Sequence, residues 1–213
     1  GLYLINLVDT VNSTNTWLSH FKNKNFDSII SLSQSKGFGR RGRVWESDLG
    51  GLYYSLILPH RKLLPLVIGV SVAVTLGRKN IDVKLKWPND ILVNGKKLGG
   101  IICQSESKDT IVGLGINIEN KPNLATSTNL QHLGYHIDKL CFVQELTEEI
   151  KYFMKCDDSE IIDKFLSYDF LIGKLVNWDG ESGIVESISE EGCLVVKKSN
   201  NELIFLTEEV HLK

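Results

Sequence analysis

The stretch SKGFGRRGRVW, residues 35–45, contains the pattern G-x-G-x-x-G and so raises the question of a dinucleotide-binding fold. In that fold the third glycine opens a helix whose N-terminus faces a pyrophosphate. Here no helical pattern follows Gly42, and the next regular segment is an alternating, aromatic run that predicts a strand at 52–58. The glycines therefore lie in a loop at 35–51, and we reject the dinucleotide fold.

The loop at 35–51 is long and basic. Loops of this length without secondary structure are uncommon in compact domains unless they have a function or are disordered. Lys36, Arg40, Arg41 and Arg43 gather four positive charges in it, and its glycines allow backbone N–H groups to approach an anion closely. A run of arginines is, about as often, only a solvated surface. The other motifs of the chain are therefore needed to choose between a solvated surface and an anion-binding loop.

Composition narrows the function classes. The chain has 213 residues, of which 42% are apolar and 23% charged, enough for a real core and a small second domain. Its net charge of −2 gives no overall attraction to nucleic acid or an anionic membrane. The longest apolar run, 63–76, is shorter than the ~20 residues of a membrane span, and no secretory signal opens the chain. Four cysteines without metal-ligand spacing predict reduced thiols and a cytoplasmic protein.

Periodicity predicts two kinds of region. In the first, strands are expected at 2–8, 29–32, 52–58, 83–86, 91–93, 97–104 and 110–116, and helices at 13–21, 65–78, 138–154 and 160–170. Asn94-Gly95 is the strongest hairpin signal in the chain. In the second, short strands are expected at 174–178, 183–188, 193–197, 203–206 and 210–212. A β unit of this size is expected to depend for its stability on packing against the rest of the chain.

Three further motifs combine polar residues with glycine near strand ends. In KWPND, 86–90, Pro88 ends ladder pairing and leaves Asn89 and Asp90 projecting. GKKLGGI, 95–101, puts Lys97 early on the returning strand of the hairpin, followed by two glycines that let a ligand come close. GLGIN, 113–117, likewise has glycines on an expected strand, here followed by the polar Asn117. Singly, each is an ordinary turn, bulge or solvated lysine.

Together the motifs resemble those of the biotin–protein ligases. NSTN (12–15), Q-x-x-G-x-G-R-R-G-R-x-W (34–45), KWPND (86–90), K-L-x-G-I (97–101) and G-x-G-I-N (113–117) occur in the family's order and at similar spacing. One departure is Phe38, where the family often has an arginine. The resemblance implies an α+β fold, in which a mixed β-sheet catalytic domain packed with helices, of the class II synthetase/biotin ligase-like type, at 1–171, is followed by a small β-barrel at 172–213. It also implies the form that lacks an amino-terminal DNA-binding domain.

The activity that the resemblance implies has two steps. Biotin, the substrate, attacks the α-phosphate of ATP with Mg²⁺ as cofactor, and a lysine of a biotin carboxyl carrier protein then attacks the biotinoyl-adenylate. Arg40 is expected to clamp phosphate oxygens, and Lys97 to hold carboxylate and α-phosphate in line. Asp90 is expected to orient the acceptor lysine, whose free pKa is ~10.4, or to take its proton. The arginine loop is expected to close over the adenylate and exclude water.

Binding roles follow from the same resemblance. Expected biotin contacts are Ser13, Thr14 and Gln34 on the ureido ring, the backbone at Gly37, Gly100 and Gly115 under the bicycle, and Ile101. Expected ATP contacts are Arg40, Arg41, Arg43, Trp45 stacked on the adenine, Asn89 beside phosphate or metal, Asn117 and Lys213. No protein metal site is expected, and His132 and His136 lack a third ligand. Whether the chain forms a homodimer stays open.

Two rival functions remain. A lipoate– or octanoate–protein ligase has the same fold and adenylate strategy, although the arginine loop with KWPND favours biotin. A non-catalytic nucleic-acid-binding regulator belongs to a different class, and the slightly acidic balance of the chain disfavours it. A protein that had lost activity would be expected to lack Lys97 or Asp90, and both are present.

Overall fold

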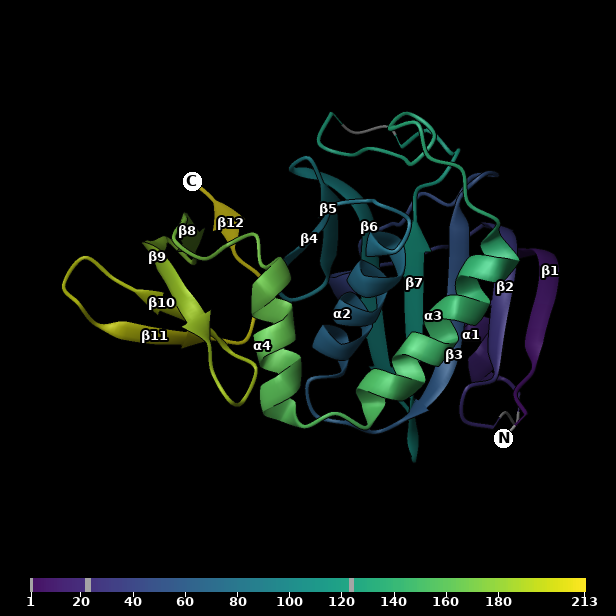
Figure 1. Ribbon diagram of the computed structural model, residues 1–213, viewed down its shortest axis with the longest axis horizontal. Coiled ribbons are helices and arrows are strands. Elements are labelled where there is room, and N and C mark those ends of the chain that lie inside the picture. The colour runs from purple at the N-terminus through teal and green to yellow at the C-terminus, as the bar shows by residue number, and fades with distance from the viewer. Residues whose placement is uncertain (1, 22–23, 123–124) are drawn as a thin grey trace.

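Within residues 2–21, 24–122 and 125–213, which the computed structural model describes, the largest element is a seven-stranded mixed sheet (Figure 1). Its strands are β1 (Ile5–Val11), β2 (Ser28–Gln34), β3 (Leu52–Pro59), β4 (Val83–Lys86), β5 (Asp90–Val93), β6 (Lys96–Ser105) and β7 (Asp109–Ile116). They lie in the order β1-β2-β3-β7-β6-β5-β4, with β1 parallel to β2 and the other neighbours antiparallel. A dinucleotide fold would need a mostly parallel sheet, so its rejection is confirmed.

The two faces of this sheet are covered differently. Helix α2 (Leu64–Gly77) is buried all round because it lies between the sheet and the helices α3 (Lys139–Met154) and α4 (Asp158–Tyr168) (Figure 1). On β3, Leu56 joins the core around α2, whereas Ile57 joins a separate cluster with Leu18 of helix α1 (Thr14–Ser19). Successive side chains of a strand point to opposite faces. Helix α1 therefore covers part of the face opposite α2.

The predicted hairpin joins β5 to β6. Asn94 and Gly95 both have positive φ, 51° and 74°, the backbone that the tight mirror-image turn requires. The turn places Lys97 on β6 and pairs Asp90 with Gly100 across the two strands. The hairpin prediction is confirmed.

The carboxy-terminal part is a five-stranded antiparallel sheet. Its strands are β8 (Leu175–Trp178), β9 (Glu181–Ile188), β10 (Leu194–Lys197), β11 (Leu203–Leu206) and β12 (His211–Leu212), in the order β11-β10-β9-β8-β12. Buried residues such as Val176 and Leu194 belong to the same apolar cluster as α2. Trp87, in the turn between β4 and β5 of the larger sheet, donates a hydrogen bond from Nε1 to the carbonyl of Gly192 at 3.0 Å. The small sheet therefore packs against the larger part of the chain, as the sequence predicts. The domain boundary at 171/172 stays a prediction.

Two local predictions need correction. The first strand was expected at 2–8 but runs from Ile5 to Val11, because parallel pairing with β2 sets Ile5 opposite Ser28 and carries the polar residues after Val8 into the strand. The loop at 35–51 was expected to be irregular, yet it contains a 3₁₀ turn at Arg40–Gly42, where Arg41 has φ 57°, and a bridge between Phe38 and Val44.

Other observations bear on the composition argument. No helix in the described part of the chain is long and apolar enough to cross a membrane. Cys103, Cys141, Cys156 and Cys193 are all free thiols. Burial raises the pKa of the Cys103 thiol to about 12, so this side chain stays protonated and unreactive at neutral pH.

Candidate active site

A cavity of about 460 Å³ lies on the sheet face that also carries α1, beneath the arginine loop. This volume is in the range of small-molecule sites. Most of the residues predicted for the site line it, namely Ser13, Thr14, Gln34, Arg40, Arg43, Trp45, Asn89, Asp90, Lys97, Gly100, Ile101, Gly115 and Asn117. Residues far apart in the sequence are thus brought together as the motifs suggest.

Three predicted residues are placed elsewhere. Gly37 lies in the loop's own packing, where an added Cβ would be 2.3 Å from the Ser47 hydroxyl and 2.6 Å from the Trp45 carbonyl. Arg41 is more than half exposed and does not line the cavity. Lys213 ends the small sheet, with its backbone N–H donating to Leu175 at 3.3 Å. Their ligand roles stay predictions without geometric support.

One end of the cavity is a buried hydrogen-bond network. Ser13 caps α1, and Thr14 donates from its backbone N–H and its hydroxyl to Gln34 Oε1 at 2.9 and 3.2 Å. Gln34 Nε2 in turn donates to Ser47 Oγ at 2.8 Å. Both acceptor positions of the Gln34 carbonyl are therefore taken, whereas one N–H of its amide has no partner among the described residues and can meet a ligand.

The network continues through residues that the sequence analysis missed. Ser55 Oγ on β3 lies 2.6 Å from Thr14 Oγ1 and 2.5 Å from Asn15 Oδ1, and Asn15 Nδ2 donates to Gln104 Oε1 on β6 at 2.9 Å. Asn15 fits only because residue 113 is glycine, where a Cβ would lie 2.5 Å from its Oδ1. In the sequence, the only indication of a role for Asn15 was its place as the second asparagine of the NSTN motif.

Removing the centre of this network should destabilise the fold. Ser55→Ala leaves the buried Asn15 carbonyl and Thr14 hydroxyl short of a partner, so we expect a loss of about 1–3 kcal/mol in unfolding free energy. Urea denaturation measures this. Ser105→Ala, at an exposed position on β6, is the matched control and should change the value by less than about 0.5 kcal/mol. Equal stability of both variants would show that the network is not needed for the fold.

A pair of glycines forms the floor beside the network. Gly100 and Gly115 are cross-strand neighbours on β6 and β7, and the indole of Trp45 packs on both. A Cβ at Gly115 would lie 2.5 Å from Trp45 Nε1, and one at Gly100 would lie 3.3 Å from its ring. Trp45 Nε1 is buried and has no hydrogen-bond partner among the described residues. The indole thus occupies the glycine floor that the sequence analysis reserved for the ligand.

The far end of the arginine loop is held at Asp48. Tyr53, on β3, donates its hydroxyl hydrogen to the Asp48 carbonyl at 2.6 Å. Burial and then the nearby Asp48 charge raise the pKa of Tyr53 well above its usual value, so the hydroxyl remains a donor. This anchor fixes where the loop rejoins the sheet.

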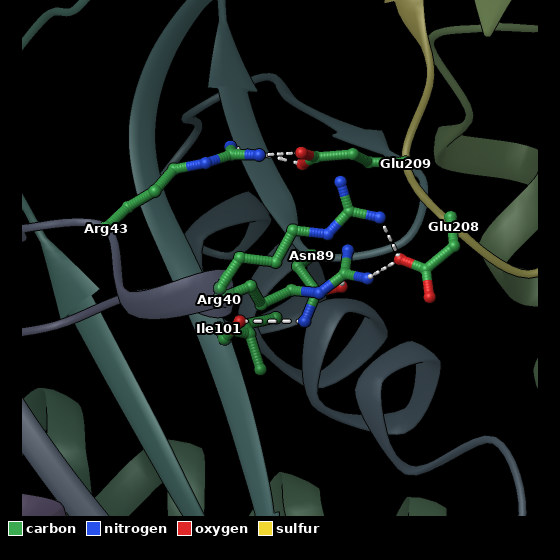
Figure 2. A network of polar contacts seen from close by, with 7 residues as sticks. Arg40, Arg43, Asn89, Ile101, Glu208 and Glu209 are labelled. Carbon is green, nitrogen blue, oxygen red and sulfur yellow. Dashed lines mark hydrogen bonds and ion pairs between the residues drawn. The ribbon is translucent and has the colours of Figure 1, made fainter. Parts of the chain in front are cut away.

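The loop's arginines contact the segment that joins β11 to β12 of the small sheet. Glu208 Oε2 lies 3.4 Å from Arg40 Nη2 and 2.5 Å from Arg41 Nη2, and Glu209 pairs with Arg43 (Figure 2). Arg40 also donates to Asn89 Oδ1 at 3.3 Å, while Asn89 Nδ2 donates to the Ile101 carbonyl at 2.7 Å. Exposed ion pairs contribute little free energy. Their effect here is to orient the guanidinium groups at the edge of the cavity.

Lys97 and Asp90 face each other in the cavity. Lys97 Nζ lies 3.0 Å from Asp90 Oδ1, and both side chains are about one third exposed. The same ammonium group is 5.2 Å from the centre of the Trp45 ring. The arrangement offers a cation and a carboxylate that a ligand can separate.

Comparison with known proteins agrees with this geometry. The sequence model of the biotin/lipoate A/B protein ligase family matches residues 7–119, more than half of the chain. The chain belongs to this family. The matched residues include strands β2 to β7 of the larger sheet, most of β1, and every motif quoted above.

Individual members of the biotin/lipoate ligase family extend the match. The bifunctional ligase/repressor BirA of Bacillus subtilis is 34% identical over 162 residues, 65% of this chain and 50% of BirA. BirA of Escherichia coli is 30% identical over 220 residues, 90% of this chain and 68% of that protein. The chain thus spans about half the length of the B. subtilis relative.

The match to a solved structure of the family covers both sheets. The biotin protein ligase from Aquifex aeolicus, in complex with biotin and ATP, has a TM-score of 0.86 and 28% identity. The match covers 99% of this chain and 98% of the Aquifex chain. The expected fold class, a helix-packed mixed sheet followed by a small β unit, is confirmed, and the unit expected as a β-barrel is a five-stranded antiparallel sheet.

Proposed function

We propose that this chain is an ATP-dependent biotin–protein ligase, which forms biotinoyl-5'-AMP and then transfers biotin to a lysine of a biotin carboxyl carrier protein. The observation that carries the proposal is a single cavity with a buried polar network at one end and cationic side chains at the other, joined by a glycine floor. The near-complete overlap with the Aquifex ligase in complex with biotin and ATP supports it.

In the first step a carboxylate oxygen of biotin forms a bond to the α-phosphorus of ATP, and the bond from that phosphorus to the bridging oxygen breaks as pyrophosphate leaves. Two anions meet, so fixed cations are the main requirement. Lys97 releases Asp90 and holds the carboxylate and α-phosphate in line, and Arg40 binds phosphate oxygens. Arg43, Asn89, Asn117 and Trp45 complete the nucleotide contacts assigned above.

In the second step the acceptor lysine nitrogen attacks the acyl carbon, and the bond to the AMP oxygen breaks. An ammonium group cannot attack, so one proton must leave first. Asp90 becomes available for that proton when Lys97 has moved to the phosphate. Lys97 Nζ lies 3.0 Å from Asp90 Oδ1, a distance that supports this exchange of partners.

Magnesium fits the site as a companion of the nucleotide. Mg²⁺ keeps several waters and binds through one or two carboxylates plus substrate phosphates. Asp90 is a cavity carboxylate beside the assigned phosphate-binding Lys97, and no group of three His, Cys, Asp or Glu side chains among the described residues is arranged to hold a metal alone. When bound, the ion neutralises charge on the phosphates.

The network end of the cavity suits the ureido ring. Gln34 has one N–H left to donate, which matches the ring's carbonyl oxygen, and Ser13 belongs to the same cavity lining. A lipoyl or octanoyl chain has no oxygen or nitrogen to accept this N–H and would leave it without a partner. The polar network therefore favours biotin over the two rival acids.

The proposal is tested by exchange of labelled pyrophosphate into ATP. Biotin, lipoate and octanoate are offered separately to the unmodified protein. We expect exchange with biotin alone. Exchange supported by lipoate or octanoate but not by biotin would assign the other branch of the family, and no exchange with any acid would reject an adenylating enzyme.

Ligand binding should also move Trp45. The indole of Trp45 lies against Gly100 and Gly115, so an adenylate that binds over these two glycines must displace it. We therefore expect the intrinsic tryptophan fluorescence to change when biotin and ATP are added. Trp45→Phe should lose the change. Trp17→Phe is the control, since Trp17 stacks on Phe21, 4.3 Å away between ring centres and outside the cavity lining. An unchanged signal in Trp45→Phe would mean that another tryptophan reports the binding.

A further inference from the structure

The cations that line the cavity differ in whether they have an acidic partner. Arg40 pairs with Glu208, Arg43 with Glu209 and Lys97 with Asp90. Lys86, the last residue of β4, also lines the cavity. In residues 2–21, 24–122 and 125–213, no carboxylate oxygen lies within 4.0 Å of its ammonium nitrogen. Lys86 therefore has no acidic partner to give up when an anionic ligand binds.

The backbone around Lys86 is fixed. Lys86 pairs with Asp90 across β4 and β5. The next residue, Trp87, is only 3% exposed and is tied to Gly192 of the small sheet. Asn89, in the same turn, bonds to Ile101 and to Arg40. These contacts hold the end of β4 in place. The ammonium group of Lys86 is therefore carried by a rigid strand end, close in sequence to Asn89, which bonds to Arg40.

The strand order gives Lys86 a place along the cavity. Going from β3 to β7, β6, β5 and β4, the sheet presents Ser55, the floor glycines, Lys97, Asp90 and finally Lys86. Neighbouring strands are ≈ 4.8 Å apart, so the backbone of Lys86 lies roughly 10 Å beyond that of Lys97, on the side away from the polar network. A ligand that runs from the network past Lys97 next meets Lys86.

We infer that Lys86 binds the β- and γ-phosphates of ATP and stabilises the pyrophosphate that leaves. This inference rests on the proposed function, because it uses the placement of the biotin carboxylate and α-phosphate at Lys97. The two phosphates beyond the α-phosphate then extend toward β4. An ammonium group is a compact point charge suited to phosphate oxygens, and charge accumulates on the leaving pyrophosphate as its bond breaks.

The test is the kinetics of pyrophosphate exchange in matched lysine variants. Lys86→Met removes the charge but keeps an unbranched side chain, and we expect the KM for pyrophosphate and for ATP to rise about ten- to hundredfold. The KM for biotin should stay within about twofold, because biotin binds at the other end. Lys86→Arg, which keeps the charge, should recover part of the loss.

Lys84→Met is the control. Lys84 lies two residues earlier on β4, hence on the same face, but it is exposed, does not line the cavity and has Asp82 at 3.9 Å. We expect wild-type constants. Circular dichroism establishes that each variant is folded, and Lys86→Gln replaces Lys86→Met should the latter be misfolded.

The outcomes separate this inference from the proposed function. If the wild-type protein shows no biotin-dependent exchange, the proposed function fails. If the wild type exchanges but the neutral Lys86 variants keep normal constants for pyrophosphate and ATP, or lose no more than Lys84→Met, the role of Lys86 is overturned. A rise confined to the KM for biotin also overturns it, because it would place Lys86 at the wrong end.

Discussion

Lys97→Ala is expected to abolish biotin-dependent exchange of pyrophosphate into ATP. Lys97 is the cavity cation nearest Asp90 and the glycine floor, with Nζ 3.0 Å from the carboxylate and 5.2 Å from the Trp45 ring. Removing a fixed charge from the centre of a reaction between two anions should lower the rate at least about a hundredfold. The neighbouring Lys96→Ala, at an exposed position on the same strand, should have little effect.

A second measurement locates the loss in the first step. Supplied with synthetic biotinoyl-adenylate, the Lys97→Ala variant should still label the acceptor protein, because Asp90 is intact. Near-normal pyrophosphate exchange in the variant would remove Lys97 from adenylate formation. Failure with the preformed adenylate as well would extend its role to the second step.

Arg40→Gly is expected to release the adenylate before the acceptor arrives. Arg40 joins the loop to Asn89 at 3.3 Å and to Glu208 at 3.4 Å, so its loss frees the loop from the cavity edge. Released adenylate reacts with any exposed amine. Biotin incorporation into a bystander such as serum albumin, added with the acceptor, should rise on the order of tenfold, the effect of losing one charged hydrogen bond.

Arg41→Gly is the matched control for this experiment. Arg41 carries the same charge in the same turn, does not line the cavity, and already has the positive φ that glycine adopts without strain. Its variant should keep selective labelling. If Arg40→Gly stays as selective as the wild type, or if both variants label bystanders equally, the specific role of Arg40 in retaining the adenylate is wrong.

The fold was largely predictable because its elements have clear local signals. A short run of apolar and aromatic residues marks β3, the longer apolar run marks α2, and Asn94-Gly95 fixes the hairpin. The start of β1 was misplaced because an edge strand with polar residues has a weak pattern, and only its pairing with β2 sets its bounds. The 3₁₀ turn in the arginine loop has no periodic signature.

Site residues could be predicted where a single motif contains both a local structural signal and a polar residue suited to the reaction. Gly100 of β6, Gly113 and Gly115 of β7 and the end of KWPND line the cavity, and their contacts with a ligand stay predictions. Gly37 was linked to the ligand, but sequence does not say which neighbour needs the space, and here the neighbours are Ser47 and Trp45. Sequence also gives no sign of contacts between residues far apart in the chain, and the contacts of Ser55 and Glu208 were missed for that reason.

The contact between the arginine loop and the small sheet limits how relatives can be recombined. Three arginines of the loop match two adjacent acids, Glu208 and Glu209, more than 160 positions away in the chain. A chimaera that takes the carboxy-terminal sheet from another ligase would set unmatched charges against this loop. The two segments should therefore be exchanged, and should change during evolution, as one unit.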